Sequence, residues 1–239
     1  SDATHGDWPW QLSQQRQGTG GTWAHSCGAS LLSETKALSA AHCVDGASAN
    51  ILRVIAGLWA RSDETGTQTS NVEYYVMHQR YQVDTASYSN DIAILHLVTP
   101  IIEGLNVAFA TLPPDNTNDF SGVLCTITGW GRNSATNILP DILQQADIGV
   151  ITTQQCASQM APVSGTEIWD NHFCLYDTAE QKGSCNGDSG GPCNCPGGAS
   201  GYYVAGVTSW GISSNGECLQ NYPSVYTRTS AYLDWIANN

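Results

Sequence analysis

The chain reads Cys185-Asn186-Gly187-Asp188-Ser189-Gly190-Gly191-Pro192 around one serine, which stands between glycines and directly after an aspartate. Alone, such a serine is typical of a turn. Two other segments give it a different meaning, namely Ser39-Ala40-Ala41-His42-Cys43 and Ser89-Asn90-Asp91-Ile92-Ala93-Ile94-Leu95. The three segments supply a histidine, an aspartate and a serine, in that order along the chain.

These three residue types suit nucleophilic catalysis by a hydroxyl group. A serine hydroxyl is a poor nucleophile at neutral pH, so it needs a base that takes its proton. The base in turn needs a carboxylate that holds its tautomer and stabilises its charged form. Taken singly, His42 beside a cysteine is commonly structural, and Asp91 before an apolar run commonly begins a strand. Their combination with Ser189 favours a catalytic constellation.

Composition points to a chain of short strands and many turns. The 239 residues suit one large all-β domain or two small halves that share a core. Charged residues make up only 12%, and there are 24 glycines. Strands are expected at Val54-Ile55-Ala56, Glu73 to Met77, Ala93 to Leu97, Thr126-Ile127-Thr128 and Tyr202 to Thr208. Turn-rich stretches are expected at Arg61 to Ser70, Pro113 to Gly122 and Asn194 to Gly201.

The end of the chain has a different pattern. Apolar residues recur at helical spacing from Ala231 to Ile236. Thr229 or Ser230 is the candidate N-cap, because a hydroxyl can accept a hydrogen bond from the first turn. We therefore expect a short C-terminal helix.

Charge and cysteine content restrict the partners and the compartment. The formal net charge of −13 argues against nucleic acid and against an anionic membrane surface. The simplest interpretation of this acidity is solubility. Nine cysteines indicate oxidation outside the cell, so a secreted, extracellular protein is expected. No apolar run is long enough to predict a transmembrane helix. The start of the sequence does not read as a signal peptide, which is typical of a mature or processed form.

The three segments resemble those of the chymotrypsin-like serine proteases, the trypsin family. The resemblance covers nearly the whole chain and is also carried by Pro9-Trp10-Gln11, Gly129-Trp130-Gly131, Ser209-Trp210-Gly211 and Pro223-Ser224-Val225-Tyr226. It implies an all-β fold of two six-stranded antiparallel β-barrels, with the active site in the cleft between them and a short C-terminal helix. One peptidase domain would span residues 1–239, with barrel halves at roughly 11–110 and 120–228 and the helix at about 229–238.

A narrower resemblance is to the fibrinolytic proteases of earthworms. Ser87-Tyr88-Ser89-Asn90-Asp91 and Leu139-Pro140-Asp141-Ile142-Leu143-Gln144 carry it. It implies fibrin or fibrinogen among the protein and peptide substrates. Protein protease inhibitors would be further partners, the chain is expected to be a monomer, and neither an organic cofactor nor a metal is implied.

The family resemblance assigns a role to each candidate catalytic residue. Ser189 would attack a peptide carbonyl, His42 would take the proton and later give it to the leaving amine, and Asp91 would orient His42. The backbone N–H groups of Gly187 and Ser189 would form the oxyanion hole. The edge segment Ser209-Trp210-Gly211 would pair with an extended substrate backbone.

The specificity pocket departs from the trypsin pattern. Trypsin-like members carry an aspartate six residues before the nucleophile, where this chain has Gly183. Gly211 and Ser224 match the wall positions of the pocket, and Ser184 and Asn186 complete its lining. The resemblance therefore predicts a neutral, roomy pocket with a broad preference for apolar side chains, as in chymotrypsin- or elastase-like members.

One loop near this pocket is longer than in chymotrypsin or trypsin. It holds the six residues from Ile212 to Glu217, and Asn215-Gly216 suggests a tight turn within it. Two alternatives stay open for Glu217. Its carboxylate could approach the pocket entrance and restore tolerance for basic side chains, or it could belong to a solvated loop without a role in specificity.

Activation is the point at which the family pattern is incomplete. Active members begin with Ile/Val-Val-Gly-Gly, and the new α-amino group pairs with the aspartate before the nucleophile, here Asp188. Aligned on Pro9-Trp10-Gln11, Ser1 stands where the fifth residue of the mature enzyme belongs. The real protein could have these residues, it could be truncated, or Asp188 could find another partner. The alternative function is accordingly a zymogen-like or non-catalytic binding member of the same fold.

Family pairing implies four disulfides: Cys27–Cys43, Cys125–Cys195, Cys156–Cys174 and Cys185–Cys218. Cys193 is left over, and it could be a buried free thiol or could compete with Cys195 for Cys125. Some family members bind calcium in a loop that matches residues 57–73. Here Leu58 replaces the first carboxylate ligand, so Asp63 and Glu64 are expected to form a solvated acidic turn rather than a metal site.

Overall fold

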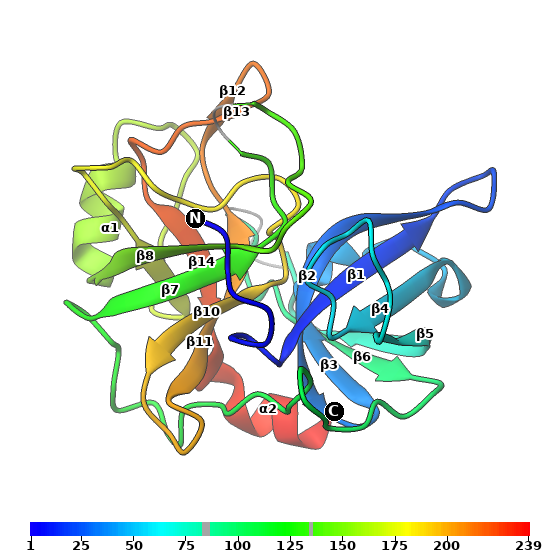
Figure 1. Cartoon of the computed structure of the whole chain (residues 1–239). Coiled ribbons are helices and arrows are strands. Elements are labelled where there is room, and N and C mark those ends of the chain that lie inside the picture. The colour runs from blue at the N-terminus through cyan, green and yellow to red at the C-terminus, as the bar shows by residue number, and fades with distance from the viewer. Residues whose placement is uncertain (83–86, 134–135) are drawn as a thin grey trace.

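The strands close into two antiparallel barrels. The computed structural model describes residues 1–82, 87–133 and 136–239. Within these residues there are two closed six-stranded barrels, which lie side by side (Figure 1). The all-β expectation is thus confirmed. None of the helices in the described ranges is long and apolar enough to cross a membrane.

The first barrel uses the N-terminal half of the chain. Its closed order is β1-β2-β3-β6-β5-β4. The strands are β1 (Gln11–Gln17), β2 (Trp23–Ser33), β3 (Lys36–Ser39), β4 (Leu52–Ala56), β5 (Gln68–Met77) and β6 (Ala93–Leu97). Two 3-10 helices, η1 (Ala41–Cys43) and η2 (Ala49–Ile51), connect β3 to β4. Apolar side chains of Leu12, Leu31, Leu38, Leu52, Ile94 and Leu95 are fully buried in its core.

The second barrel uses the C-terminal half. Its closed order is β10-β11-β14-β9-β8-β7. The strands are β7 (Leu124–Gly129), β8 (Gln144–Ile151), β9 (His172–Leu175), β10 (Pro192–Pro196), β11 (Tyr202–Trp210) and β14 (Ser224–Arg228). A small two-stranded hairpin, β12 (Ser213–Ser214) and β13 (Glu217–Cys218), projects from this half (Figure 1).

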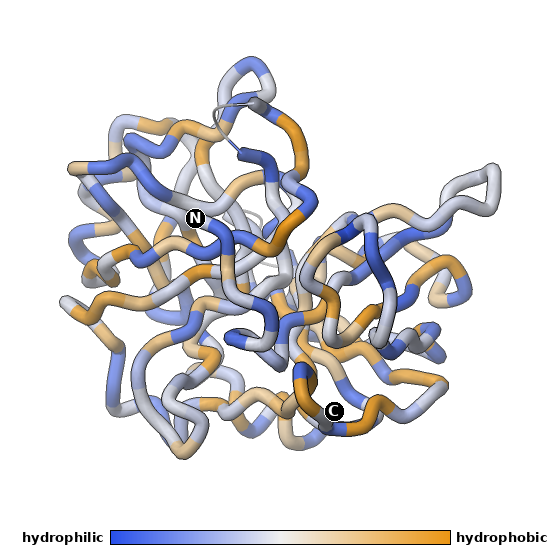
Figure 2. The backbone as a smooth tube through the Cα atoms, in the orientation of Figure 1, coloured by the Kyte–Doolittle hydropathy of each residue, from blue (hydrophilic) through white to orange (hydrophobic). Residues whose placement is uncertain are grey.

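Apolar residues concentrate where the strands cross the interior. Figure 2 shows hydrophobic segments along strands of both barrels and hydrophilic segments over many connecting loops. Trp130, which lies just after β7, packs with the core of the first barrel, as do Val204 and Val207 of β11. The indole N–H of Trp10 donates to the amide oxygen of Asn194 at 2.8 Å, and both side chains are buried. The two halves therefore share one packed interface.

The turn expected from Asn194 to Gly201 was partly wrong. Asn194 lies within β10, fully buried, and its amide donates to the carbonyl of Thr126 on the neighbouring strand. The polar residue is tolerated in a strand because its hydrogen bonds are made inside the barrel interface. Asn and Pro are typical turn residues, and the sequence around Asn194 does not reveal the hydrogen bond to Thr126 that allows it to lie in a strand.

Helical structure also differs from expectation. An α-helix, α1 (Thr153–Met160), begins with a capping box between Thr152 and Gln155, which the sequence reading missed. The C-terminal helix is present, but it consists of a 3-10 turn, η3 (Thr229–Tyr232), followed by α2 (Leu233–Asn238).

The expected N-cap at Thr229 or Ser230 was wrong. Neither hydroxyl caps the helix, because Thr229 donates to the carbonyl of Val204 and Ser230 donates to Asn116. Both residues are buried, and these tertiary partners take the hydroxyls that a local pattern would assign to the helix terminus.

Candidate active site

His42 and Asp91 meet because two strands of the first barrel are paired. Ser39 at the end of β3 lies opposite Ala93 at the start of β6. His42 follows Ser39 on η1, and Asp91 shortly precedes Ala93. The antiparallel register thus brings segments that are 49 residues apart to one point.

The geometry of this pair determines the histidine tautomer. The Nδ1 atom of His42 lies 2.6 Å from Oδ2 of Asp91, and the backbone N–H of His42 donates to Oδ1 at 2.9 Å. Since a carboxylate only accepts, Nδ1 carries the hydrogen and Nε2 is left as the acceptor. The carboxylate also accepts from the Ser209 hydroxyl at 2.6 Å, so its burial is compensated by three donors.

Ser189 is held in the loop before β10 by bonds to both barrels. Its carbonyl accepts from Gly28 N–H of β2 at 2.7 Å, and Gly190 N–H donates to Thr208 of β11 at 2.8 Å. Gly187 has a φ of +101°. A side chain there would meet Leu139 Cδ2 at 3.0 Å and Gly131 Cα at 3.2 Å. Both the conformation and the space therefore require glycine.

One pocket brings together most of the predicted site residues. His42, Ser184, Asn186, Ser189, Ser209, Trp210, Gly211 and Ser224 all line it. Gly183 lines an adjacent cavity instead, Asp91 lies behind His42, and Gly187 lines neither. Sequence reasoning missed Tyr88, whose ring centroid lies 5.5 Å from that of His42, and also Gln220.

The surroundings of Gly211 at the pocket entrance and of Gly183 in the adjacent cavity differ in how much free space they contain. A methyl group built on Gly211 would meet no atom within 4 Å, so the entrance is open. A methyl group on Gly183 would overlap the amide oxygen of Gln220 and would come within 2.7 Å of the Ser224 hydroxyl. The space above Gly183 is therefore already occupied by two polar side chains.

Glu217 does not line the pocket. It lies exposed on β13 of the hairpin that projects from the second barrel (Figure 1). Asn215 and Gly216, with φ of 52° and 81°, form the expected tight turn between β12 and β13. Of the two alternatives for Glu217, the structure supports the solvated loop.

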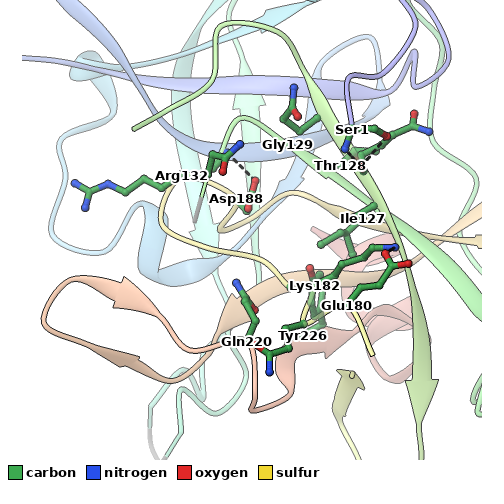
Figure 3. A pocket seen from close by; sticks show the side chains of 17 residues that line it. Ser1, Ile127, Thr128, Gly129, Arg132, Glu180, Lys182, Asp188, Gln220 and Tyr226 are labelled. Carbon is green, nitrogen blue, oxygen red and sulfur yellow. Dashed lines mark hydrogen bonds and ion pairs between the residues drawn. The ribbon is translucent and has the colours of Figure 1, made fainter. Parts of the chain in front are cut away.

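Asp188 faces a second cavity beside the first. Figure 3 shows its carboxylate among lining side chains that include Ser1, Lys182 and Gln220. Oδ1 accepts from Gly131 N–H at 2.8 Å and Oδ2 accepts from Cys185 N–H at 3.0 Å. Removal from bulk water raises the pKa of Asp188 to about 6, despite these two donors. A cationic group in this cavity would stabilise the charged carboxylate.

His25 supports the same loop from the first barrel. Its Nε2 atom lies 2.8 Å from the carbonyl oxygen of Gly187, and its Nδ1 lies 2.8 Å from the Ser13 hydroxyl. Burial lowers the pKa of His25 to about 4, so the ring is neutral at pH 7. A carbonyl needs a donor, hence Nε2 carries the hydrogen and Nδ1 accepts from Ser13. The sequence alone offered no signal for this contact.

Disulfides brace both candidate catalytic segments. The structure contains the four pairs that family resemblance implies: Cys27–Cys43, Cys125–Cys195, Cys156–Cys174 and Cys185–Cys218. Cys27–Cys43 joins β2 to η1, and Cys185–Cys218 joins the Ser189 loop to β13. Each closed loop is worth about 2–4 kcal/mol.

Of the two alternatives for Cys193, the structure shows the buried free thiol. Its sulfur lies within 4.8 Å of those of Cys125 and Cys195, but these two are joined to each other. Among the described residues no other group of histidine, cysteine and carboxylate ligand atoms is gathered closely enough for a metal. Asp63 accepts from Thr65 N–H, and Glu64 pairs with Arg53 at 3.3 Å, so their oxygens do not converge.

Comparison with known proteins identifies the class. The Trypsin family profile matches residues 1–236, and the fold of two six-stranded barrels is the one that the resemblance implied. The chain belongs to the trypsin family of serine endopeptidases, which are hydrolases.

Particular relatives lie within this family. The chain is 61% identical over 240 residues to "Fibrinolytic enzyme, isozyme C" of the earthworm Lumbricus rubellus. The alignment covers 100% of this chain and 98% of the relative. It is 35% identical over 247 residues to "Chymotrypsin-like serine proteinase" of Haliotis rufescens, at 99% and 88% coverage. It is 34% identical over 243 residues to "Trypsin-1" of Astacus astacus, at 100% and 98% coverage.

Proposed function

We propose that this serine endopeptidase cleaves through an acyl-enzyme on Ser189, with His42 as general base and then general acid. The observation that carries the proposal is the 2.6 Å contact of His42 Nδ1 with the fully buried Asp91, at the edge of the pocket that Ser189 lines. Asp91 orients the ring, and its charge stabilises the imidazolium that forms when Nε2 takes the serine proton.

The tetrahedral intermediate requires donors for its oxyanion. The backbone N–H groups of Gly187 and Ser189 supply them, and glycine at 187 lets the backbone approach the substrate closely. The segment Ser209-Trp210-Gly211 at the end of β11 pairs with the extended substrate backbone, and the pocket beside it takes the side chain that precedes the cleaved bond.

The proposed substrate preference is broad and apolar at that position, the P1 residue. Gly183 removes the carboxylate of trypsin-like pockets, and the open space at Gly211 admits large side chains. Each additional methylene discriminates by only ~1–3 kcal/mol, so several apolar side chains are accepted. Peptide amides that differ only at P1 test this preference, and a strong preference for arginine or lysine overturns it.

The nucleophile is tested by covalent labelling. A fluorophosphonate should modify Ser189 alone, as peptide mapping by mass spectrometry would show, and Ser189→Ala should abolish both labelling and turnover. Ser158→Ala, an exposed serine on α1, is the matched control and should keep both. Absence of labelling with the fold intact would favour the zymogen-like or non-catalytic alternative.

We also propose that Asp188 is the partner of a cationic activation group, an α-amino terminus. The supporting observations are the cavity in front of its carboxylate and its raised pKa of about 6. Replacing the carboxylate by an amide, Asp188→Asn, should slow labelling of Ser189 in the active enzyme at least tenfold. The exposed Asp234→Asn on α2 serves as control. An unchanged labelling rate contradicts the role of Asp188.

Three further proposals concern the substrate, the location and the oligomeric state of the enzyme. The 61% identical relative is named a fibrinolytic enzyme, so fibrin is a proposed substrate, tested by the release of soluble fragments from a purified fibrin clot. Four disulfides support secretion into an oxidising extracellular space. A monomer that is blocked by protein protease inhibitors is expected, and light scattering of the purified enzyme measures its mass.

A further inference from the structure

We propose that the carboxamide of Gln220 forms the floor of the specificity pocket and favours P1 tyrosine over phenylalanine. The inference deepens the proposed function and rests on it, since it concerns the same pocket. Gln220 lies between β13 and β14, outside every segment that suggested the family. Its side chain lines the pocket of Ser189 and also the cavity of Asp188, which Figure 3 shows, so it forms part of the wall between them.

The position of the amide follows from its contacts. Nε2 of Gln220 donates to the carbonyl of Ser184 at 3.2 Å, which ties the carboxamide to a residue that lines the pocket of Ser189. Oε1 lies where a side chain of residue 183 would begin, because a methyl group built on Gly183 would overlap it. Gln220 therefore occupies the place where trypsin-like members have a carboxylate.

The oxygen of this amide is an available acceptor. Within the described residues no N–H or O–H group donates to Gln220 Oε1, and it is not among the buried side-chain atoms that have no partner. It is thus exposed to at least one of the two cavities that the Gln220 side chain lines. Beside it, the Ser224 hydroxyl accepts from Ser184 N–H at 3.1 Å, so the floor is polar while the entrance at Gly211 is open.

A neutral acceptor at the floor of an open pocket recognises a neutral donor at the tip of a long side chain. The phenol of tyrosine has such a donor and phenylalanine has none. A net hydrogen bond is worth about 0.5–1.5 kcal/mol, which corresponds to about a 2- to 12-fold difference in kcat/KM. The amide oxygen lacks the full charge with which the carboxylate of trypsin-like members binds arginine or lysine. Basic P1 residues therefore gain less binding energy from Gln220 than from that carboxylate.

The first experiment compares matched peptide amides with tyrosine or phenylalanine at P1. The wild-type enzyme should cleave the tyrosine peptide with the higher kcat/KM. Gln220→Met keeps the length of the side chain but loses the acceptor, so the ratio should fall about 2- to 12-fold. Gln154→Met, at an exposed position on α1, should keep the wild-type ratio. An unchanged ratio in Gln220→Met overturns the proposal.

A second variant tests the location of residue 220 independently of its hydrogen bond. Gln220→Glu places a carboxylate at the same position, and it should raise the kcat/KM for P1 lysine relative to P1 leucine at least tenfold. A residue with only a structural role would not move this ratio, and an unmoved ratio also overturns the proposal. Fluorophosphonate labelling of Ser189 in each variant reports whether the site is assembled.

Failure of the proposed function has a different signature. If the wild-type enzyme neither reacts with the fluorophosphonate nor cleaves the P1 leucine peptide, the acyl-enzyme mechanism is wrong. If it does both and the P1 ratios do not depend on residue 220, only the inference about Gln220 is wrong.

Discussion

Single side chains in this enzyme act mainly through the backbone groups that they hold. Asp91 holds both the ring and the backbone N–H of His42, and Asp188 holds two N–H groups around the Ser189 loop. His25 holds the carbonyl of Gly187 from the opposite barrel. The geometry at Ser189 therefore depends on charged and polar groups that never need to touch the substrate.

His25 provides the first prediction at the residue scale. His25→Phe keeps a ring beside Trp130, 5.5 Å away between centroids, but it removes the donor to Gly187. Since one hydrogen bond that positions the proposed oxyanion donor is lost, kcat should fall about 3- to 10-fold with little change in KM. Steady-state kinetics on one P1 leucine peptide measures both.

A conservative variant separates positioning from packing at this site. His25→Gln retains a donor and should recover part of the lost kcat. If His25→Phe changes KM as much as kcat, or if His25→Gln is no better, the positioning role is wrong.

Gly183 provides the second prediction at this scale. Gly183→Asp reproduces the trypsin residue, but its side chain collides with Gln220 and Ser224. It should destabilise the fold by about 1–3 kcal/mol and should not create efficient cleavage after arginine. The double variant Gly183→Asp/Gln220→Ala should cleave after arginine better than either single variant, because the amide that lies closest to residue 183 is then removed. Urea denaturation and kcat/KM values on a P1 arginine peptide test the two statements.

Among the elements, the barrel strands position the site and the short helices are local additions. The pairing of β3 with β6 brings His42 to Asp91, and β11 holds the Ser189 loop through the bond from Gly190 N–H to Thr208. The hairpin of β12 and β13 projects from the second barrel and carries Glu217 into solvent. Helix α1 is tied to β9 by Cys156–Cys174 and is capped by its own sequence.

The cap of α1 gives a prediction at this scale. Thr152 accepts from Gln155 N–H at 3.1 Å, and the side chain of Gln155 accepts from Thr152 N–H at 2.9 Å. Thr152→Ala should lower the free energy of unfolding by about 1 kcal/mol without a change in kcat/KM. Ser158→Ala on the same helix should change it by less than about 0.5 kcal/mol. Equal effects of the two variants in urea denaturation would contradict the role of the cap.

For the whole molecule, folding buries titratable groups whose charge states depend on pH. Burial lowers the pKa values of His25 and His172 to about 4 each. The unfolded chain binds these protons near pH 6.5, but the folded chain does so only near pH 4. Stability from the neutral rings is therefore present above pH 6.5 and is lost as the pH falls toward 4. Burial raises the pKa of Asp188 to about 6, so its effect on stability has the opposite sign. Its contribution to stability falls as the pH rises over roughly pH 4–6.

The contribution of His172 can be isolated. Its Nδ1 accepts from Trp169 N–H at 3.1 Å, a role that the side-chain oxygen of His172→Asn can keep. Between pH 7 and pH 4.5, the variant should lose about 2 kcal/mol less unfolding free energy than the parent, because it has no proton to bind there. Urea denaturation at both pH values measures the difference. Equal losses in the two proteins would show that His172 is not the group that titrates.

The family, the two-barrel fold and a set of candidate catalytic residues could all be predicted from the sequence. His42, Asp91 and Ser189 stand in segments whose neighbours are required by the chemistry, so local pattern carries the information. Strands such as β6 were placed correctly, because alternating or continuous apolar residues record burial. The absence of a carboxylate at Gly183 was equally visible.

The tertiary structure alone decided which polar groups face one another. Asn194 in β10, the hydroxyls of Thr229 and Ser230, the contact of His25 with Gly187 and the placement of Gln220 above Gly183 join residues distant in sequence. Local propensity is short-ranged, whereas a buried hydrogen bond depends on which chain segments the closed barrels bring within about 3 Å. The pattern around Ser189 thus predicts a protease, and the fold determines what lies at the base of its pocket.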